Sequence, residues 1–136
     1  MPEGKALTII VSSPGAVREA LRAVLSSFSQ LEVIGAVGGG LSAMNKIREQ
    51  RPGLLVIDGN LAEDEVLALL AQVRQEQPQV RCIVLVETPR QRGKVLSAGA
   101  HAVLPRGDPL ENLQAAIERL TVTTPPSQVS ARGKTN

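Results

Sequence analysis

Five short apolar runs, most of them rich in β-branched residues, recur at regular intervals along the chain. Such nearly continuous runs are typical of strands that are buried on both faces of a parallel sheet. Polar residues, glycine or proline end most of the runs, as expected where a strand passes into a loop. The pattern predicts strands at residues 6–11, 31–37, 54–58, 80–86 and 102–104.

Between and after these runs, apolar residues recur at the spacing of amphipathic helices, which predicts one helix after each strand. For the first helix, Ser13 is placed to act as N-cap and Pro14 as the first helical residue. The fourth helix is predicted to be short, around residues 94–97, and to end at Gly99. The apolar stripes are Ala16, Val17, Ala20, Leu21, Val24, Leu25 and Phe28; Ala43, Met44 and Ile47; Val66, Leu69, Leu70 and Val73; and Leu110, Leu113, Ala116, Ile117 and Leu120.

Alternating strands and helices predict an α/β domain with a parallel sheet and helices on both faces, because parallel neighbours need crossover connections. The chain has 136 residues, of which 43% are hydrophobic and 21% charged, which favours one globular domain. We expect this domain to span residues 1–120 and a flexible basic tail or linker, rich in Ser, Thr and Pro, to span residues 121–136.

The charge balance and the lack of a long apolar segment argue against two kinds of partner, nucleic acids and membranes. The basic excess is small, 15 residues against 13 acidic ones, and Arg132 and Lys134 in the tail account for it. We therefore expect no nucleic-acid partner, and the cluster Arg90, Arg92 and Lys94 is interpreted as a solvated helix face. The sequence shows neither a bilayer-spanning run nor a signal peptide, so we expect no membrane contact and a cytoplasmic location.

Polar side chains follow the predicted strands at their carboxyl ends, where open parallel sheets bind ligands. Ser12 and Ser13 follow the first strand, Asp58 ends the third, and Glu87 and Thr88 follow the fourth. A carboxylate directly after a buried strand either caps the next loop or serves as ligand or nucleophile, and the pattern leaves both interpretations open.

An enzyme is not expected. The sequence has neither a Cys/His cluster for a metal nor a recognisable set of nucleophile and base. Cys82 lies in an apolar run and is predicted to be a buried, inert thiol, and His101 is interpreted as a surface residue rather than a base.

From about Ala6 to Leu120, the chain resembles the receiver domain of bacterial response regulators, closest to the type that precedes a helix-turn-helix output domain. The resemblance is carried by TIIVSSPGAVREALRAVLSS, LEVIGAVGGGLSAMNKIREQRPGLLVID and AGAHAVLPRGDPLENLQAAIERL. It implies a flavodoxin-like, doubly wound sheet of five parallel strands in the order 2-1-3-4-5, with five helices. It also implies a role in two-component phosphorelay signal transduction.

The resemblance implies that Asp58 is the candidate phosphoacceptor and that Asn60 stands where the family offers a backbone carbonyl to Mg²⁺. Two acidic residues normally follow the first strand of a receiver and help to hold this ion, but Ser12 and Ser13 stand at their positions. Neutral hydroxyls are weak substitutes for anionic ligands of a hard cation. We expect no cofactor and at most weak Mg²⁺ binding at Asp58.

Further departures concern the switch site. The family's Thr or Ser after the fourth strand corresponds to Glu87, or to Thr88 if the register shifts by one position, and its lysine corresponds to Arg106. The aromatic switch position is occupied by Val103. We hypothesise that Arg106 pairs with Asp58 or Glu87. The alternative is that these side chains point into water, where an exposed ion pair contributes about 0–1 kcal/mol.

The predicted function is therefore a receiver with a degraded magnesium and switch site that acts through protein–protein interaction. The resemblance implies that the partners are a histidine kinase or a downstream protein, bound at the face of the fourth helix, fifth strand and fifth helix, and this face also allows a homodimer. The alternative is a phosphate- or nucleotide-binding module that uses Ser12, Ser13, Pro14 and Gly15 at a helix N-terminus, and an ordinary serine cap competes with it.

Overall fold

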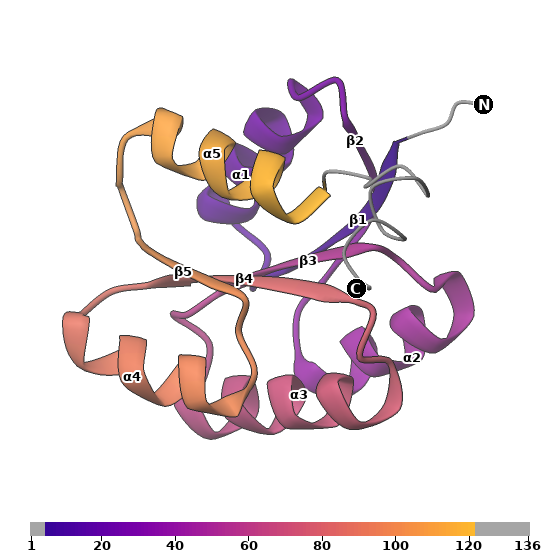
Figure 1. Cartoon of the computed structure of the whole chain (residues 1–136), viewed down its shortest axis with the longest axis vertical. Coiled ribbons are helices and arrows are strands. Elements are labelled where there is room, and N and C mark those ends of the chain that lie inside the picture. The colour runs from indigo at the N-terminus through magenta and orange to yellow at the C-terminus, as the bar shows by residue number, and fades with distance from the viewer. Residues whose placement is uncertain (1–4, 122–136) are drawn as a thin grey trace, which may run out of the picture.

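The computed structural model describes residues 5–121, which form a five-stranded parallel sheet between two layers of helices (Figure 1). The strands are β1 (Ala6–Val11), β2 (Leu31–Val37), β3 (Leu54–Asp58), β4 (Arg81–Val86) and β5 (Ala102–Pro105). The helices are α1 (Ala16–Ser26), α2 (Gly40–Gln50), α3 (Glu63–Glu76), α4 (Pro89–Ala98) and α5 (Leu110–Thr121). All neighbouring strands are parallel, in the order β2-β1-β3-β4-β5. The predicted fold and strand order are confirmed.

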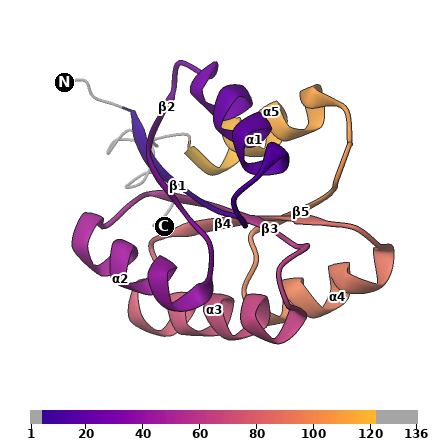
Figure 2. The same cartoon turned by 180° about the vertical axis from the view of Figure 1, so that it is seen from behind.

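Two apolar cores lie on opposite faces of the sheet. Helices α1 and α5 cover one face, and α2, α3 and α4 cover the other (Figures 1 and 2). Successive side chains of a strand point to opposite faces, so Leu55 and Val56 belong to different cores. All five residues of β3 are buried, which explains its uninterrupted apolar run. Asp58 thus stands at the buried carboxyl end of the central strand.

The start of α1 differs from the prediction. The helix begins at Ala16 with Gly15 as its N-cap, so Ser13 is not the cap and Pro14 is not the first helical residue. Gly15 has φ of 143°, a conformation open to glycine because it lacks a Cβ, and the chain turns into the helix there. Leu21, among the predicted stripe, is buried, whereas Val17 is exposed.

Helix α4 is longer than predicted. It spans Pro89–Ala98 rather than a few residues around Lys94, and Val95 is its buried apolar residue. Because a helix with so little apolar surface has a weak periodic signal, the sequence underestimates its length. Its predicted end is confirmed, since Gly99 forms the C-cap with φ of 127°.

The glycines before α2 allow a neighbouring helix to cap it. Glu65 of α3 accepts a hydrogen bond from the Gly40 backbone N–H at 2.7 Å. A Cβ on Gly39 would lie 2.7 Å from the same carboxylate oxygen. The small residues therefore make room for an anion at the positive end of the helix dipole.

Of the predicted tail, Thr121 ends α5 and the remainder lies outside the described residues. Across residues 5–121, the helices are too short or too polar for any of them to traverse a bilayer.

Candidate functional site at the carboxyl ends of the strands

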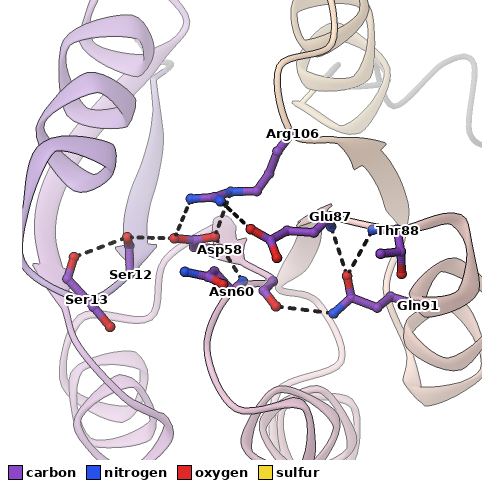
Figure 3. A network of polar contacts seen from close by, with 9 residues as sticks. Ser12, Ser13, Asp58, Asn60, Glu87, Thr88, Gln91 and Arg106 are labelled. Carbon is purple, nitrogen blue, oxygen red and sulfur yellow. Dashed lines mark hydrogen bonds and ion pairs between the residues drawn. The ribbon is translucent and has the colours of Figure 1, made fainter.

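The carboxyl ends of β1, β3, β4 and β5 bring four polar side chains into one cluster (Figure 3). Ser12 follows β1, Asp58 ends β3, Glu87 follows β4 and Arg106 follows β5. The Arg106 backbone N–H donates to the carbonyl of Val86 at 2.8 Å, which continues the pairing of β4 and β5 up to the cluster. Parallel strands align their carboxyl ends at one edge, and this alignment places the predicted site residues together.

Asp58 is a buried carboxylate with polar partners on both of its oxygens. Only 4% of the residue's surface is exposed to solvent. The Ser12 hydroxyl donates to Oδ2 at 3.2 Å, and the Asn60 backbone N–H donates to Oδ1 at 3.0 Å. Arg106 completes the shell, with Nε 3.2 Å from Oδ1 and Nη2 donating to Oδ2 at 3.4 Å. Burying a charge without such partners costs several kcal/mol, on the order of 3–5 kcal/mol when one partner of a pair is removed.

Arg106 joins this buried carboxylate to a second, exposed one. Its Nη1 donates to Glu87 Oε2 at 2.7 Å, and the Glu87 side chain is 46% exposed against 25% for Arg106. A planar guanidinium can serve two carboxylates at once, whereas an ammonium group is a compact point charge. The hypothesis that Arg106 pairs with Asp58 or Glu87 is confirmed for both. The alternative that the side chains point into water is wrong for Asp58 and Arg106, whereas the Glu87 carboxylate stays partly exposed. We call this arrangement the Asp58–Arg106–Glu87 network.

Ser12 and Ser13 have different surroundings. Ser12 is completely buried and its hydroxyl contacts Asp58 and, at 3.3 Å, the Ser13 carbonyl. Arg18 of α1 donates two hydrogen bonds to the Ser12 carbonyl, at 3.0 and 2.6 Å. Ser13 is exposed. The polar groups of Ser12 are thus engaged within the chain, and Arg18 is a contributor that the sequence reasoning missed.

The segment after β4 is held by Gln91, the third residue of α4. Its Oε1 accepts hydrogen bonds from the backbone N–H groups of Glu87 at 2.8 Å and Thr88 at 3.3 Å. Its Nε2 donates to the carbonyl of Gly59 at 3.3 Å. Thr88 is the N-cap of α4. The preceding residue, Glu87, contacts Arg106. Which of the two has a switch role stays a prediction. Sequence reasoning missed Gln91, although a Gln three residues after Thr88 is a signal for a helix start.

Oxygen ligands with negative charge are sparse in this cluster. Within residues 5–121, no three His, Cys, Asp or Glu side chains gather so that they could hold a metal ion. Ser12 and the Asn60 backbone offer neutral oxygens near Asp58, and both Asp58 oxygens already contact Arg106. The acidic side chains of the cluster are Asp58 and Glu87, and Arg106 contacts both of them.

The remaining predicted residues lie away from the network. Cys82 is buried, as predicted, and burial raises the pKa of its thiol to about 12, so the thiol is protonated near neutral pH. His101 is half-buried, and its Nδ1 accepts a hydrogen bond from the Cys82 backbone N–H at 3.0 Å. Arg90, Arg92 and Lys94 are exposed, as interpreted from the sequence. Lys94 also pairs with Glu63 at 3.5 Å.

The domain is a doubly wound sheet with an aspartate at the end of its central strand and a cationic side chain after its last strand. This chain belongs to the response regulator receiver domain family, whose model matches residues 9–118.

Curated relatives are similar over most of the chain. Protein-glutamate methylesterase/protein-glutamine glutaminase 1 of Photobacterium profundum is 30% identical over 101 residues, which are 71% of this chain and 28% of that protein. The Chromobacterium violaceum protein of the same name is 31% identical over 99 residues, again 71% of this chain and 28% of the relative. The chain thus spans less than a third of the length of these relatives.

Solved structures show the same fold. A two-component response regulator of the LuxR family from Aurantimonas superposes with a TM-score of 0.79 at 19% identity, covering 96% of this chain and 97% of the other. The signal receiver domain of the response regulator NarL from Mycobacterium tuberculosis superposes with a TM-score of 0.77 at 18% identity, covering 89% and 100%.

Proposed function

We propose that this chain is an atypical receiver domain of a two-component response regulator, which acts through protein–protein contacts and has no catalytic activity of its own. One observation carries the proposal: the guanidinium of Arg106 contacts both oxygens of Asp58, the residue at the phosphoacceptor position. The arginine therefore keeps the positive charge of the family's lysine and places it against both oxygens of the carboxylate.

The chemistry of phosphoryl transfer supports this reading of the site. For Asp58 to become phosphorylated, one of its oxygens must attack phosphorus while the leaving group departs, and positive charge must neutralise the equatorial oxygens. Both oxygens contact Arg106, and Oδ2 also accepts from Ser12. The residues present do not fit a resident Mg²⁺ ion, because the buried Ser12 replaces a carboxylate and Asp58 is neutralised by a side chain.

We propose that the Asp58–Arg106–Glu87 network keeps the strand ends in one fixed arrangement. It joins the ends of β3, β4 and β5, and β5 lies next to α4 and α5 on the two faces of the sheet. In this proposal, the face formed by α4, β5 and α5 is the surface that binds a histidine kinase, a downstream protein or a second copy of the domain. The solved structures of the LuxR family and NarL support a receiver of the type that precedes a helix-turn-helix domain.

Intact-mass spectrometry after incubation with acetyl phosphate and Mg²⁺ tests the proposal. We expect the wild type to keep its mass, as Asp58→Ala does, while a receiver that accepts phosphate gains one phosphoryl group and releases acetate in the same mixture. A phosphoryl mass on the wild type that Asp58→Ala lacks would show that Asp58 retains its chemistry, and the proposal would then be wrong.

A further inference from the structure

Gln91 links the two loops that flank the phosphoacceptor position. Its amide oxygen accepts from the backbone N–H groups of Glu87 and Thr88, and its amide nitrogen donates to the carbonyl of Gly59 (Figure 3). Gly59 directly follows Asp58, and Glu87 provides the second carboxylate of the network. One side chain of α4 thus contacts the backbone beside both carboxylates that Arg106 bridges.

A helix cap alone accounts for part of this geometry. A Gln at the third position of a helix commonly accepts a hydrogen bond from the N-cap backbone N–H, which here belongs to Thr88. The bonds to Glu87 and Gly59 go further, because neither residue belongs to α4. The 2.8 Å bond to Glu87 is the shortest of the three that Gln91 makes.

The close approach of the two loops is built into the backbone. The Gly59 N–H donates to the carbonyl of Leu85 in β4 at 2.6 Å, and a Cβ at position 59 would collide with that carbonyl. Because residue 59 is glycine, the segment after β3 lies near enough to α4 for the amide of Gln91 to span the gap.

Glu87 needs such an anchor because nearly half of its side chain is exposed. An exposed carboxylate can exchange a protein partner for water and loses rotational freedom when it is fixed, so its ion pair is weak by itself. Holding the Glu87 backbone limits the positions that its carboxylate can adopt and keeps it near Nη1 of Arg106, 2.7 Å away.

We propose that Gln91 is a positioning residue, which fixes Glu87 against Arg106 and thereby couples α4 to the charge network around Asp58. The inference rests on the proposed function, in which that network holds the receiver in one state. A protein that binds α4 and displaces the Gln91 amide would then release Glu87 from Arg106 without any phosphate.

The side-chain Nε–H signal of Arg106 in ¹H–¹⁵N NMR spectra tests this role, because Nε lies 3.2 Å from Asp58 Oδ1. We expect Gln91→Ala to shift this signal in the same direction as Glu87→Ala and to accelerate its solvent exchange by about threefold or more. Combining both substitutions should add little to the effect of Glu87→Ala alone. A residue that only caps α4 would change helix amide signals and leave the Arg106 signal in place.

A matched control lies on another face of the molecule. Gln72 donates to Glu76, which in turn accepts from Nε of Arg48 at 3.0 Å. Gln72→Ala should therefore move the Arg48 Nε–H signal and leave that of Arg106 unchanged, the reverse of Gln91→Ala. If Gln91→Ala does not fold, Gln91→Leu takes its place, since it keeps much of the side-chain volume and loses both the acceptor for Glu87 and the donor to Gly59.

An Arg106 signal at its wild-type position in the folded Gln91 variant would overturn the inference. That result would leave the proposed function standing, because the mass experiment tests phosphorylation of Asp58 and does not depend on Gln91. Conversely, phosphorylation of Asp58 would overturn the proposed function, and the NMR comparison would still decide whether Gln91 positions Glu87.

Discussion

A single guanidinium satisfies two carboxylates that differ in their access to water. Asp58 is buried and depends on Arg106 for compensation of its charge, whereas Glu87 is partly solvated. The two contacts therefore contribute unequally to stability, because desolvation makes loss of a buried partner far more costly than loss of an exposed one.

A double-mutant cycle measures this inequality. We expect Arg106→Ala to lower the free energy of unfolding by about 3 kcal/mol, because it leaves a buried carboxylate without its cation. Asp58→Ala should cost about 1–2 kcal/mol, and the coupling between the two should be of order 1–3 kcal/mol in urea denaturation. Glu87→Ala, the control for the exposed contact, should cost about 0–1 kcal/mol. Strictly additive losses for Arg106 and Asp58 would contradict a stabilising pair.

His101 gives the domain a dependence on pH. Burial, followed by the positive charge of Arg81, lowers the pKa of its imidazole in the folded state, and its Nδ1 must stay unprotonated to accept from Cys82. As pH falls below about 6.5, the unfolded chain gains a proton there before the folded chain does, so stability is present above that pH and is lost below it.

Urea denaturation at a series of pH values tests this. His101→Gln retains an acceptor without titrating, and we expect it to lose less stability than the wild type between about pH 7.5 and the folded-state pKa of His101. Equal losses in the two proteins would assign the pH dependence to other groups.

The helices receive part of their stability from residues of neighbouring elements. Glu65 of α3 caps α2 through Gly40, and Gln91 of α4 holds the loops after β3 and β4. Contacts of this kind do not follow from the periodicity of the helix that they stabilise. They depend instead on small residues, such as Gly39, that leave space for the incoming side chain.

Gly39→Ala should displace the Glu65 carboxylate and lower stability by about 1 kcal/mol. Gly39 has φ of −165°, so backbone strain does not contribute, and the cost should largely disappear when Glu65 is also replaced by Ala. Gly93→Ala is the control: its Cβ meets open space within α4, and a gain of about 0.5–1 kcal/mol is expected from thermal or urea denaturation. A full loss for Gly39→Ala in the Glu65→Ala background would contradict this account.

The fold as a whole could be predicted because buried strands such as β3 are recognisable in the sequence as unbroken apolar runs. Asp58 and its neighbours could be placed together because parallel strands share one edge for their carboxyl ends. The contacts of Arg18 with Ser12, of Glu65 with Gly40 and of Gln91 with Gly59 could not be predicted, since each side chain bonds the backbone of a residue outside its own helix. Local periodicity carries no information about such partners.

Restoring the acidic pair tests whether its loss decides the chemistry of the domain. In a variant with Ser12→Asp, Ser13→Asp and Arg106→Lys, we expect Mg²⁺ at about ten times its Kd to stabilise the fold by about 1.4 kcal/mol. The wild type, and the same variant carrying Asp58→Ala, should show no comparable rise in Tm. A folded triple variant that does not respond to Mg²⁺ would mean that other residues also exclude the ion.

The graded exposure of the Asp58–Arg106–Glu87 network has a consequence for its response to ionic strength. Dissolved ions screen charges that face water far more than charges enclosed by protein, and the Debye length falls to about 3 Å in 1 M salt. Salt should therefore detach the outer carboxylate, on Glu87, while the inner contact to Asp58 persists. At high salt the domain would then keep the buried ion pair between Arg106 and Asp58 and lose the exposed ion pair between Arg106 and Glu87.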